Sequence, residues 1–280
     1  MKLNVIKRER DFLRVFGTEA ESYLQGQLSQ DIEGMSYGEA RFSFLLQPSG
    51  KVEAWLRVVR CNENEYLLDV DKGFGELVTA RLERFLLRTD CALEASECSL
   101  YTGVNNSKIE KDFSDCFALF YSWFKLDFVD YIFTSSDLPE DLFFEENQVW
   151  EEIRIKAGIP EMGKEIDDST IPASLGIVDS SVSFTKGCYT GQELVARVDS
   201  RKGGTPYRLV KISGDLDVVA DQRYLSKNDE KIGTVTSQVV TGDGFFALGF
   251  LKRGVESPTE AQVINDDLEE KNVHVMPLEA

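Results

Sequence analysis

The sequence predicts an α+β fold with antiparallel sheets and a small C-terminal β-barrel, and three features carry this prediction. Three strand patterns between residues 41 and 70 precede a helical pattern at about 74–88, an order typical of an antiparallel sheet with helices on one face. Beyond residue 206, short strand patterns alternate with turn residues, as they do in barrels. The chain has 280 residues, 42% of them hydrophobic, which suffices for a large core and for two or three domains.

The N-terminal elements follow from alternation and from capping residues. Residues 11–16 alternate between polar and apolar side chains like a short strand. Thr18 and Glu21 have the spacing of a capping box, so a helix is expected to follow and to stop at Gly26. The strands after this helix are expected at 41–47, 52–60 and 66–70.

The chain beyond residue 114 contains an aromatic stretch, a helix and the barrel strands. Residues 115–134 are expected to form a strand pair whose rings belong to the core. The acidic residues 137–146 are expected in a loop or at an exposed helix start. A helix is expected over 148–157 and ends at Gly158 because Pro160 follows. The expected linker is 201–206, and the expected barrel strands are 207–213, 230–236, 244–251, 261–265 and 272–278.

The charge of the chain limits its partners. There are 49 acidic and 31 basic residues, so the formal net charge is −18. This charge opposes non-specific attraction to nucleic acid and to anionic membranes, and no direct nucleic-acid binding is expected. The N-terminus lacks the apolar run of a signal peptide, and no apolar segment is long enough to span a membrane. We therefore expect a cytoplasmic protein without a membrane partner.

Cysteine and histidine usage argues against several kinds of site. The five cysteines, at 61, 91, 98, 116 and 188, are scattered and include no Cys-x-x-Cys pair, so no stably bound metal is predicted. The only histidine is His274, which excludes a histidine-based catalytic triad and a multi-histidine metal site. Scattered thiols of odd number suit a reducing compartment.

Residues 184–198 combine a thiol, a cation and turn glycines more densely than any other stretch. Thr190 and Glu193 have capping-box spacing, so a helix is expected to start at about Gly191. Cys188 then lies just before the helix start, where free amides and the nearby Lys186 ammonium favour a thiolate. The alternative is a structural cysteine among glycines that only serve a turn.

The same stretch resembles the signature of a known family. Lys186-Gly187-Cys188-Tyr189-Thr190-Gly191-Gln192-Glu193, followed by Ala196-Arg197, is similar to the signature of the YgfZ family of folate-binding, iron–sulfur-cluster-related proteins. Two other segments, Tyr23–Asp31 with its Gln-Gly-Gln sequence and Arg154–Pro160, also resemble that family. Its fold is similar to that of the glycine-cleavage T-protein, an aminomethyltransferase.

The resemblance implies a specific architecture. Two antiparallel-sheet α+β lobes, which are ferredoxin-like halves, and a C-terminal β-barrel would form three lobes around a central cavity. The implied domains are a folate-binding lobe with the signature (1–50 and 115–203), a second α+β lobe (51–114) and the barrel (204–280).

The resemblance also implies a tetrahydrofolate site, because the family binds folate. Folate needs an apolar slot for its pterin ring, polar groups for the ring edge and cations for its glutamate tail. The candidate stacking residues are Tyr23, Trp55 and Tyr189, and the candidate polar and cationic residues are Gln27, Lys51, Arg57, Arg154 and Lys186. Any chemistry would centre on Cys188, with Glu193 and Arg197 shaping the loop.

Two departures from the transferase pattern bear on the reaction class. Ala54 and Trp55 occupy the positions of a paired aspartate that the transferases need, and neither side chain can act as an acid or a base. Lys156 replaces a pterin-binding glutamate, which puts a donor where an acceptor is required and implies a weakened folate site. An accessory protein is therefore favoured over an enzyme.

The sequence thus leads to one principal functional hypothesis and two alternatives. The principal one is a tetrahydrofolate-binding protein that assists the synthesis, repair or maintenance of iron–sulfur enzymes, including radical tRNA-modifying enzymes. The alternatives are a tetrahydrofolate-dependent aminomethyltransferase and a non-catalytic adaptor that docks a client protein. The client, the folate species and the oligomeric state stay open.

Overall fold

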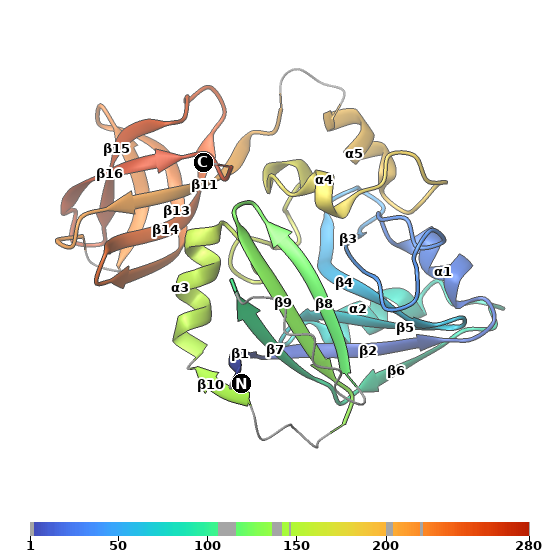
Figure 1. Ribbon diagram of the computed structural model, residues 1–280. Helices are drawn as coiled ribbons and strands as arrows, with labels where there is room; N and C mark the ends of the chain where they lie inside the picture. The colour runs from blue at the N-terminus through green and yellow to red at the C-terminus, as the bar shows by residue number, and fades with distance from the viewer. Residues whose placement is uncertain are drawn as a thin grey trace. The chain divides into compact units, whose positions relative to one another are not determined.

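A computed structural model describes residues 3–105, 116–135, 142–145, 147–199, 204–218 and 221–279 (Figure 1). The chain forms two compact units. Unit 1 comprises Met1–Asn147 and Asp179–Leu194, and unit 2 comprises Gln148–Val178 and Val195–Ala280.

The first sheet of unit 1 is antiparallel and has the strand order β3-β4-β5-β2-β6. Its strands are β2 (Arg10–Phe16), β3 (Ala40–Leu46), β4 (Val52–Asn62), β5 (Glu65–Asp71) and β6 (Ala92–Ser96). Two helices, α1 (Ala20–Gln27) and α2 (Gly75–Glu83), both contact β5. The Tyr23 hydroxyl on α1 donates to the Leu82 carbonyl on α2 at 2.5 Å, so both helices cover the same face.

The second sheet of unit 1 has the order β10-β1-β7-β9-β8. Its strands are β1 (Leu3–Arg8), β7 (Ser99–Val104), β8 (Cys116–Trp123), β9 (Leu126–Phe133) and β10 (Leu142–Glu145). β10 pairs in parallel with β1, whereas the other pairs are antiparallel. Side chains of both sheets share one apolar cluster, which includes Phe12, Val59, Leu67, Leu100, Leu119 and Ile132.

Unit 2 consists of α3 (Asn147–Ala157), the 3-10 helix η1 (Pro172–Ser174) and a closed six-stranded barrel in the order β11-β14-β13-β12-β15-β16. The barrel strands are β11 (Tyr207–Gly214), β12 (Gln222–Lys227), β13 (Glu230–Thr241), β14 (Gly244–Lys252), β15 (Thr259–Asn265) and β16 (Glu270–Met276). The helices α4 (Val178–Ser181) and α5 (Gln192–Asp199) belong to the segments where the chain passes between the units.

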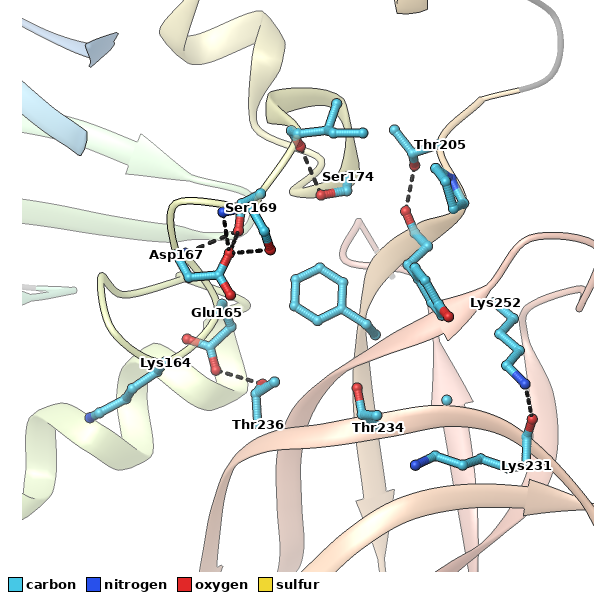
Figure 2. Close-up of a pocket in the computed structure, with 16 residues that line it drawn as sticks. Lys164, Glu165, Asp167, Ser169, Ser174, Thr205, Lys231, Thr234, Thr236 and Lys252 are labelled. Carbon is cyan, nitrogen blue, oxygen red and sulfur yellow. Dashed lines mark hydrogen bonds between the residues drawn. The ribbon is translucent and has the colours of Figure 1, made fainter. Parts of the chain in front are cut away.

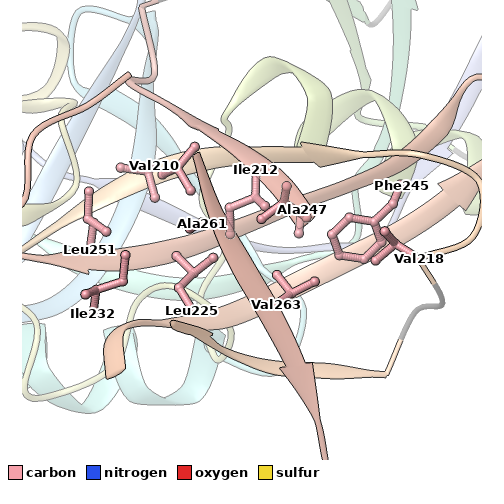
Figure 3. Close-up of a cluster of buried hydrophobic side chains, with 12 residues drawn as sticks. Val210, Ile212, Val218, Leu225, Ile232, Phe245, Ala247, Leu251, Ala261 and Val263 are labelled. Carbon is pink, nitrogen blue, oxygen red and sulfur yellow. The ribbon is translucent and has the colours of Figure 1, made fainter. Parts of the chain in front are cut away.

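Alternation along the barrel strands separates an inner from an outer core. Val210, Ile212, Ala247 and Leu251 lie in the cluster inside the barrel (Figure 3). Leu209 and Leu248, their neighbours in sequence, instead pack outside the barrel against Ile155 of α3. The outer face of this part of the barrel is therefore covered by the rest of unit 2.

The predicted fold class is confirmed, since the structure is mixed α and β with mainly antiparallel sheets and a C-terminal barrel. Several details differ. The capping box at Thr18 is wrong: its hydroxyl donates to Asp90, while Glu21 accepts from Tyr66. The predicted helix at 74–88 ends at Glu83. Within the acidic stretch, 142–145 form a strand, and 137–141 and 146 lie outside the described residues.

The domain boundary expected between residues 50 and 51 falls in the turn from β3 to β4. These strands are neighbours in one sheet, with Ala40 opposite Val59 and Leu45 opposite Ala54. Residues 201–203 of the expected linker lie outside the described residues.

Candidate functional site

The signature loop, residues 186–193, lies against the end of helix α1. The Thr190 amide donates to the Gly26 carbonyl at 3.2 Å, and just before the loop the Ser183 amide donates to the Ser29 carbonyl at 3.0 Å. Two of the sequence motifs, Tyr23–Asp31 and the signature, are therefore in direct contact although about 160 residues separate them.

Lys186 ties the loop to α1 through three backbone carbonyls. Its ammonium donates to the carbonyls of Gln25 at 2.6 Å, Leu28 at 2.8 Å and Gln30 at 2.9 Å. The last carbonyls of a helix lack partners within the helix, and a cation is favourable there. Burial lowers the pKa of Lys186 to about 8, and Asp31 and Glu33 raise it in part.

This geometry changes the role expected for Lys186. An ammonium has three N–H donors, and all three point to backbone carbonyls. None is left to donate to a Cys188 thiolate. Lys186 therefore positions the loop, and the idea that it holds the thiolate directly is wrong.

Two glycines allow the loop to approach the β3–β4 turn. Gly191 has φ +83°, and a Cβ there would lie 2.6 Å from the Gln47 carbonyl oxygen. Gly50 has φ +82°, and a Cβ there would lie 2.3 Å from Cβ of Leu194. Both positions need glycine for backbone conformation and for space.

The thiol of Cys188 is exposed, whereas the other four cysteines are half-buried. Burial raises the pKa of Cys61 to about 12, of Cys91 to about 11 and of Cys116 to about 12, and it also raises the pKa of Cys98. Those four thiols stay protonated at neutral pH and react slowly, because the thiolate is the nucleophile. Cys188 is the thiol that a large partner can reach.

The remaining signature residues shape the loop or face solvent. The Tyr189 amide donates to Oε1 of Gln192 at 3.2 Å, which closes the turn before α5. The Tyr189 ring is half-buried, its pKa is raised to about 12 by burial, and Nζ of Lys186 lies 5.2 Å from its centroid. Gly187, Glu193 and Arg197 are exposed, and α5 begins at Gln192, one residue later than expected.

Two of the predicted stacking residues are parts of the core. Tyr23 is buried between α1 and α2, where it donates to Leu82. Trp55 is stacked on Phe42 with centroids 5.1 Å apart and meets Trp123 edge-on at 5.8 Å. Its indole nitrogen donates to the Ser181 hydroxyl at 3.0 Å. A pterin ring would have to displace these neighbours to stack on either side chain.

Arg57, on β4, links the two sheets of unit 1. Its guanidinium donates to Asp69 at 2.8 Å and to Asp130 at 2.5 Å, and all three groups are buried. Thr102 and Tyr121 also donate to Asp130. Sequence reasoning missed both aspartates, although carboxylates inside the apolar runs 66–70 and 128–132 signal burial with a partner.

Arg154 and Lys156 lie in unit 2. Arg154 is buried, and its donors reach Glu151, Glu165, the Ser237 hydroxyl and the Ile159 carbonyl. A folate carboxylate would have to displace one of these acceptors. Lys156 donates to Glu152 at 2.7 Å and lies 4.3 Å from the Phe246 ring centroid.

The candidate site is the place where three segments of unit 1 meet, and we call it the three-segment site. It comprises the end of α1 at Gly26–Gln27, the turn at Gly50–Lys51 and the signature loop. Gln27, Lys51 and Tyr189 are half-buried there. They offer an amide, an ammonium and an aromatic ring, which are the kinds of group that a folate requires.

Neither a metal centre nor a membrane span is recorded in the part of the chain that the structure describes. Its His, Cys, Asp and Glu side chains include no group of three or more arranged to hold a metal ion. Its helices include none long and apolar enough to cross a membrane.

Known proteins resemble this chain over most of its length. No family model matches the sequence. An uncharacterized protein of Haemophilus influenzae is 24% identical, with 91% of each chain covered. The tRNA-modifying protein YgfZ of Aliivibrio fischeri is 24% identical over 89% of this chain and 84% of its own length, and that of Escherichia fergusonii is 22% identical over 94% and 89%.

A solved structure shares the fold. The glycine cleavage system aminomethyltransferase T of Bartonella henselae superposes with a TM-score of 0.83 at 18% identity, covering 99% of this chain and 86% of the transferase. The chain therefore has the fold of the glycine cleavage system aminomethyltransferase T, and its sequence is similar to those of tRNA-modifying proteins named YgfZ.

Proposed function

We propose that this protein assists the synthesis, repair or maintenance of iron–sulfur enzymes in the cytoplasm, among them tRNA-modifying radical enzymes, and that it binds tetrahydrofolate. The observation that carries the proposal is the exposed Cys188 on a loop fixed at both ends. Similarity to tRNA-modifying proteins named YgfZ supports the same role.

The loop gives Cys188 a defined position without burying it. Lys186 fixes the loop on one side, and the contact of Gly191 with the β3–β4 turn fixes it on the other. A single thiol cannot complete an internal dithiol cycle. It can form a mixed disulfide with a client or lend one ligand to a cluster in transit, and both suit a helper protein.

Tetrahydrofolate would be held at the three-segment site by Gln27, Lys51 and Tyr189. Aminomethyl transfer is disfavoured as the activity, because Ala54 is fully buried and its neighbour Trp55 stacks on Phe42 and donates to the Ser181 hydroxyl. Neither position supplies the carboxylate that a transferase needs. A non-catalytic adaptor stays the second candidate, since an exposed, well-fixed loop is also suited to docking.

The folate part is tested by calorimetric titration of the full chain with tetrahydrofolate. We expect saturable binding that Lys51→Met and Tyr189→Ala weaken. Lys72→Met is the matched control, because Lys72 is an exposed lysine of unit 1 that pairs with Asp11. No detectable binding to the native chain would contradict the folate part and favour the adaptor.

The thiol part is tested in cells that lack their own protein of this kind. The content of the nucleoside made by an iron–sulfur tRNA-modifying enzyme should be restored by the native chain and by Thr185→Ala, a change at an exposed residue of the same segment. It should not be restored by Cys188→Ser. If Cys188→Ser restores it and Gly191→Val does not, the loop acts by docking alone.

A further inference from the structure

A hollow lies entirely within unit 2, and no residue of the three-segment site lines it. Its volume is about 570 Å³, which is ample for a ligand the size of a nucleotide. One wall is the loop between α3 and η1, with Asp167, Ser169 and Ile171, and the other wall is formed by β11, β13 and β14 (Figure 2).

A buried ion pair holds the two walls together. Glu165, at the start of the loop wall, accepts hydrogen bonds from the hydroxyls of Thr236 at 2.7 Å and Ser237 at 2.5 Å, both on β13. Arg154 donates to Glu165 and also to Ser237. Because these bonds are internal to the protein, the hollow is formed before any ligand arrives.

The sides of the hollow are apolar and partly aromatic. Phe250 on β14 is half-buried, Tyr207 at the start of β11 is 46% exposed, and Ile171 and Pro206 complete this lining. Phe250 also packs on the outer core of the barrel, so its ring is fixed. A fixed aromatic ring beside open space favours a planar ligand. A planar ring can stack on it with an offset, and each of the two rings then buries the face that contacts the other.

The barrel side of the hollow carries two ammonium groups. Lys252 donates to the Lys231 carbonyl at 2.6 Å, which holds its side chain and leaves two N–H donors (Figure 2). Nζ of Lys231 lies 5.0 Å from the Tyr224 ring centroid. Among the described residues, neither lysine has a carboxylate within ion-pair distance, whereas Lys164 pairs with Glu151 and Glu161. In a chain of net charge −18, two such cations lining one hollow favour an anion.

The loop side of the hollow offers acceptors instead. Asp167 accepts from the Ser169 amide at 2.9 Å, the Ser169 hydroxyl at 2.7 Å and the Thr170 hydroxyl at 2.8 Å. All three bonds end on Oδ1, so Oδ2 can accept from a ligand. Figure 2 shows Asp167 and Ser169 on the loop, with Lys231 and Lys252 on the barrel strands. The hollow therefore has an acceptor wall and a cationic wall.

We propose that this hollow binds a ligand in which a planar ring with an N–H donor edge is joined to a phosphate, as in a purine nucleoside 5′-monophosphate. The phosphate accepts hydrogen bonds from Lys231 and Lys252, the ring stacks on Phe250, and the N–H edge of the ring donates to Asp167. The site is independent of the three-segment site, whose residues all belong to unit 1.

Calorimetric titration of the full chain with guanosine 5′-monophosphate tests this assignment. We expect saturable binding that the double change Lys231→Gln and Lys252→Gln weakens by about tenfold or more, because charge-assisted hydrogen bonds are lost. Lys227→Gln is the matched control, since Lys227 is an exposed barrel lysine that contacts Thr259 and lies outside the hollow. Guanosine without phosphate should bind more weakly than the nucleotide, and Asp167→Asn should weaken the nucleotide as well.

Three results would overturn the assignment. They are no saturable binding of guanosine 5′-monophosphate to the native chain, equal binding by the double-lysine variant, and equal affinity for guanosine and its phosphate. Tetrahydrofolate binding should be unchanged in the double-lysine variant. A loss of folate binding there would instead assign the hollow to folate.

Discussion

Two cations, the half-buried Lys186 and the buried Arg154, shape this protein by directing their donors inward. Lys186 gives all three donors to the end of α1, and Arg154 reaches acceptors on α3, the following loop and β13. Each cation thereby joins segments that are distant in sequence. Removing either one leaves buried acceptors without a partner, which costs more than the bond itself contributes.

The first prediction concerns pH and Lys186. The folded state releases this proton near pH 8, whereas the unfolded chain keeps it to the ordinary lysine value of 10.5. Between these values the unfolded chain binds more protons, so stability rises with pH. The native chain should gain unfolding free energy relative to Lys186→Met from pH 8 to 10, as measured by urea denaturation. Parallel pH profiles for the two proteins would contradict this expectation.

The second prediction concerns Arg154. Arg154→Met leaves the Glu165 carboxylate buried without its cation, and breaking a buried pair in this way costs about 3–5 kcal/mol. Urea unfolding should report this loss. Lys164→Met is the control, since Lys164 is an exposed lysine that pairs with Glu151 and Glu161, and it should cost about 1 kcal/mol or less. Adding Glu165→Gln to Arg154→Met should recover part of the loss.

At this scale the sequence analysis singled out the signature and the Gln-Gly-Gln segment separately, and their contact with each other became visible only in the structure. Lys186 was paired with Cys188 because the two are close in sequence, whereas its acceptors lie near residue 28. Every residue has a backbone carbonyl, so the amino-acid sequence does not mark which carbonyls accept a hydrogen bond from a lysine. Contacts of this kind therefore cannot be predicted from a motif.

Among the elements, the contact between the β3–β4 turn and the signature loop matters most for the site. Gly50 and Gly191 come from different motifs, yet a Cβ on Gly191 would lie 3.2 Å from Cα of Gly50. Backbone packs against backbone at this point, so Lys51 and Tyr189 are held at fixed positions on either side of the contact.

The third prediction compares two glycines of the same loop. Gly191→Ala places a side chain at φ +83° and against Gln47, and the strain should cost about 1–3 kcal/mol. Gly187→Ala meets no atom within 4 Å and should cost about 0.5 kcal/mol or less. Thermal unfolding of both variants measures the difference. Equal midpoints would show that the loop does not depend on this close approach.

The sequence analysis predicted no strand at β1, β6, β7, β10 or β12, and β12 shows one reason. β12 reads Gln-Arg-Tyr-Leu-Ser-Lys and contains shifts of register with both of its neighbours, so it shows no apolar alternation. Helix α2 was expected to run to about residue 88 because Phe85 and Leu86 continue the apolar pattern, but the helix ends at Glu83, Phe85 is exposed and Leu86 is half-buried. The longer alternating strands, such as β4 and β14, were predicted nearly to their ends.

For the molecule as a whole, the distribution of charge decides which large partners can bind. The chain has 18 more acidic than basic residues, and this excess of negative charge repels a polyanion. A role connected with tRNA is therefore expected to act through a protein client and not through the nucleic acid.

The fourth prediction is that the full chain does not bind tRNA. Electrophoretic mobility of tRNA should be unchanged by micromolar protein at 50 mM and at 150 mM salt, because few phosphates can be neutralised. A basic RNA-binding protein under the same conditions is the positive control. Binding that falls steeply between the two salt concentrations would reveal a basic surface and contradict the expectation.

The closed barrel affects which part of the protein aggregates on heating. Every barrel strand is paired on both sides, so the described barrel offers no free edge on which another chain could add a strand. Unit 1 has open sheets, and its end strand β8 exposes Phe120. Ordered aggregates should therefore begin with strands of unit 1, and the barrel should be the part that proteases recover intact from them.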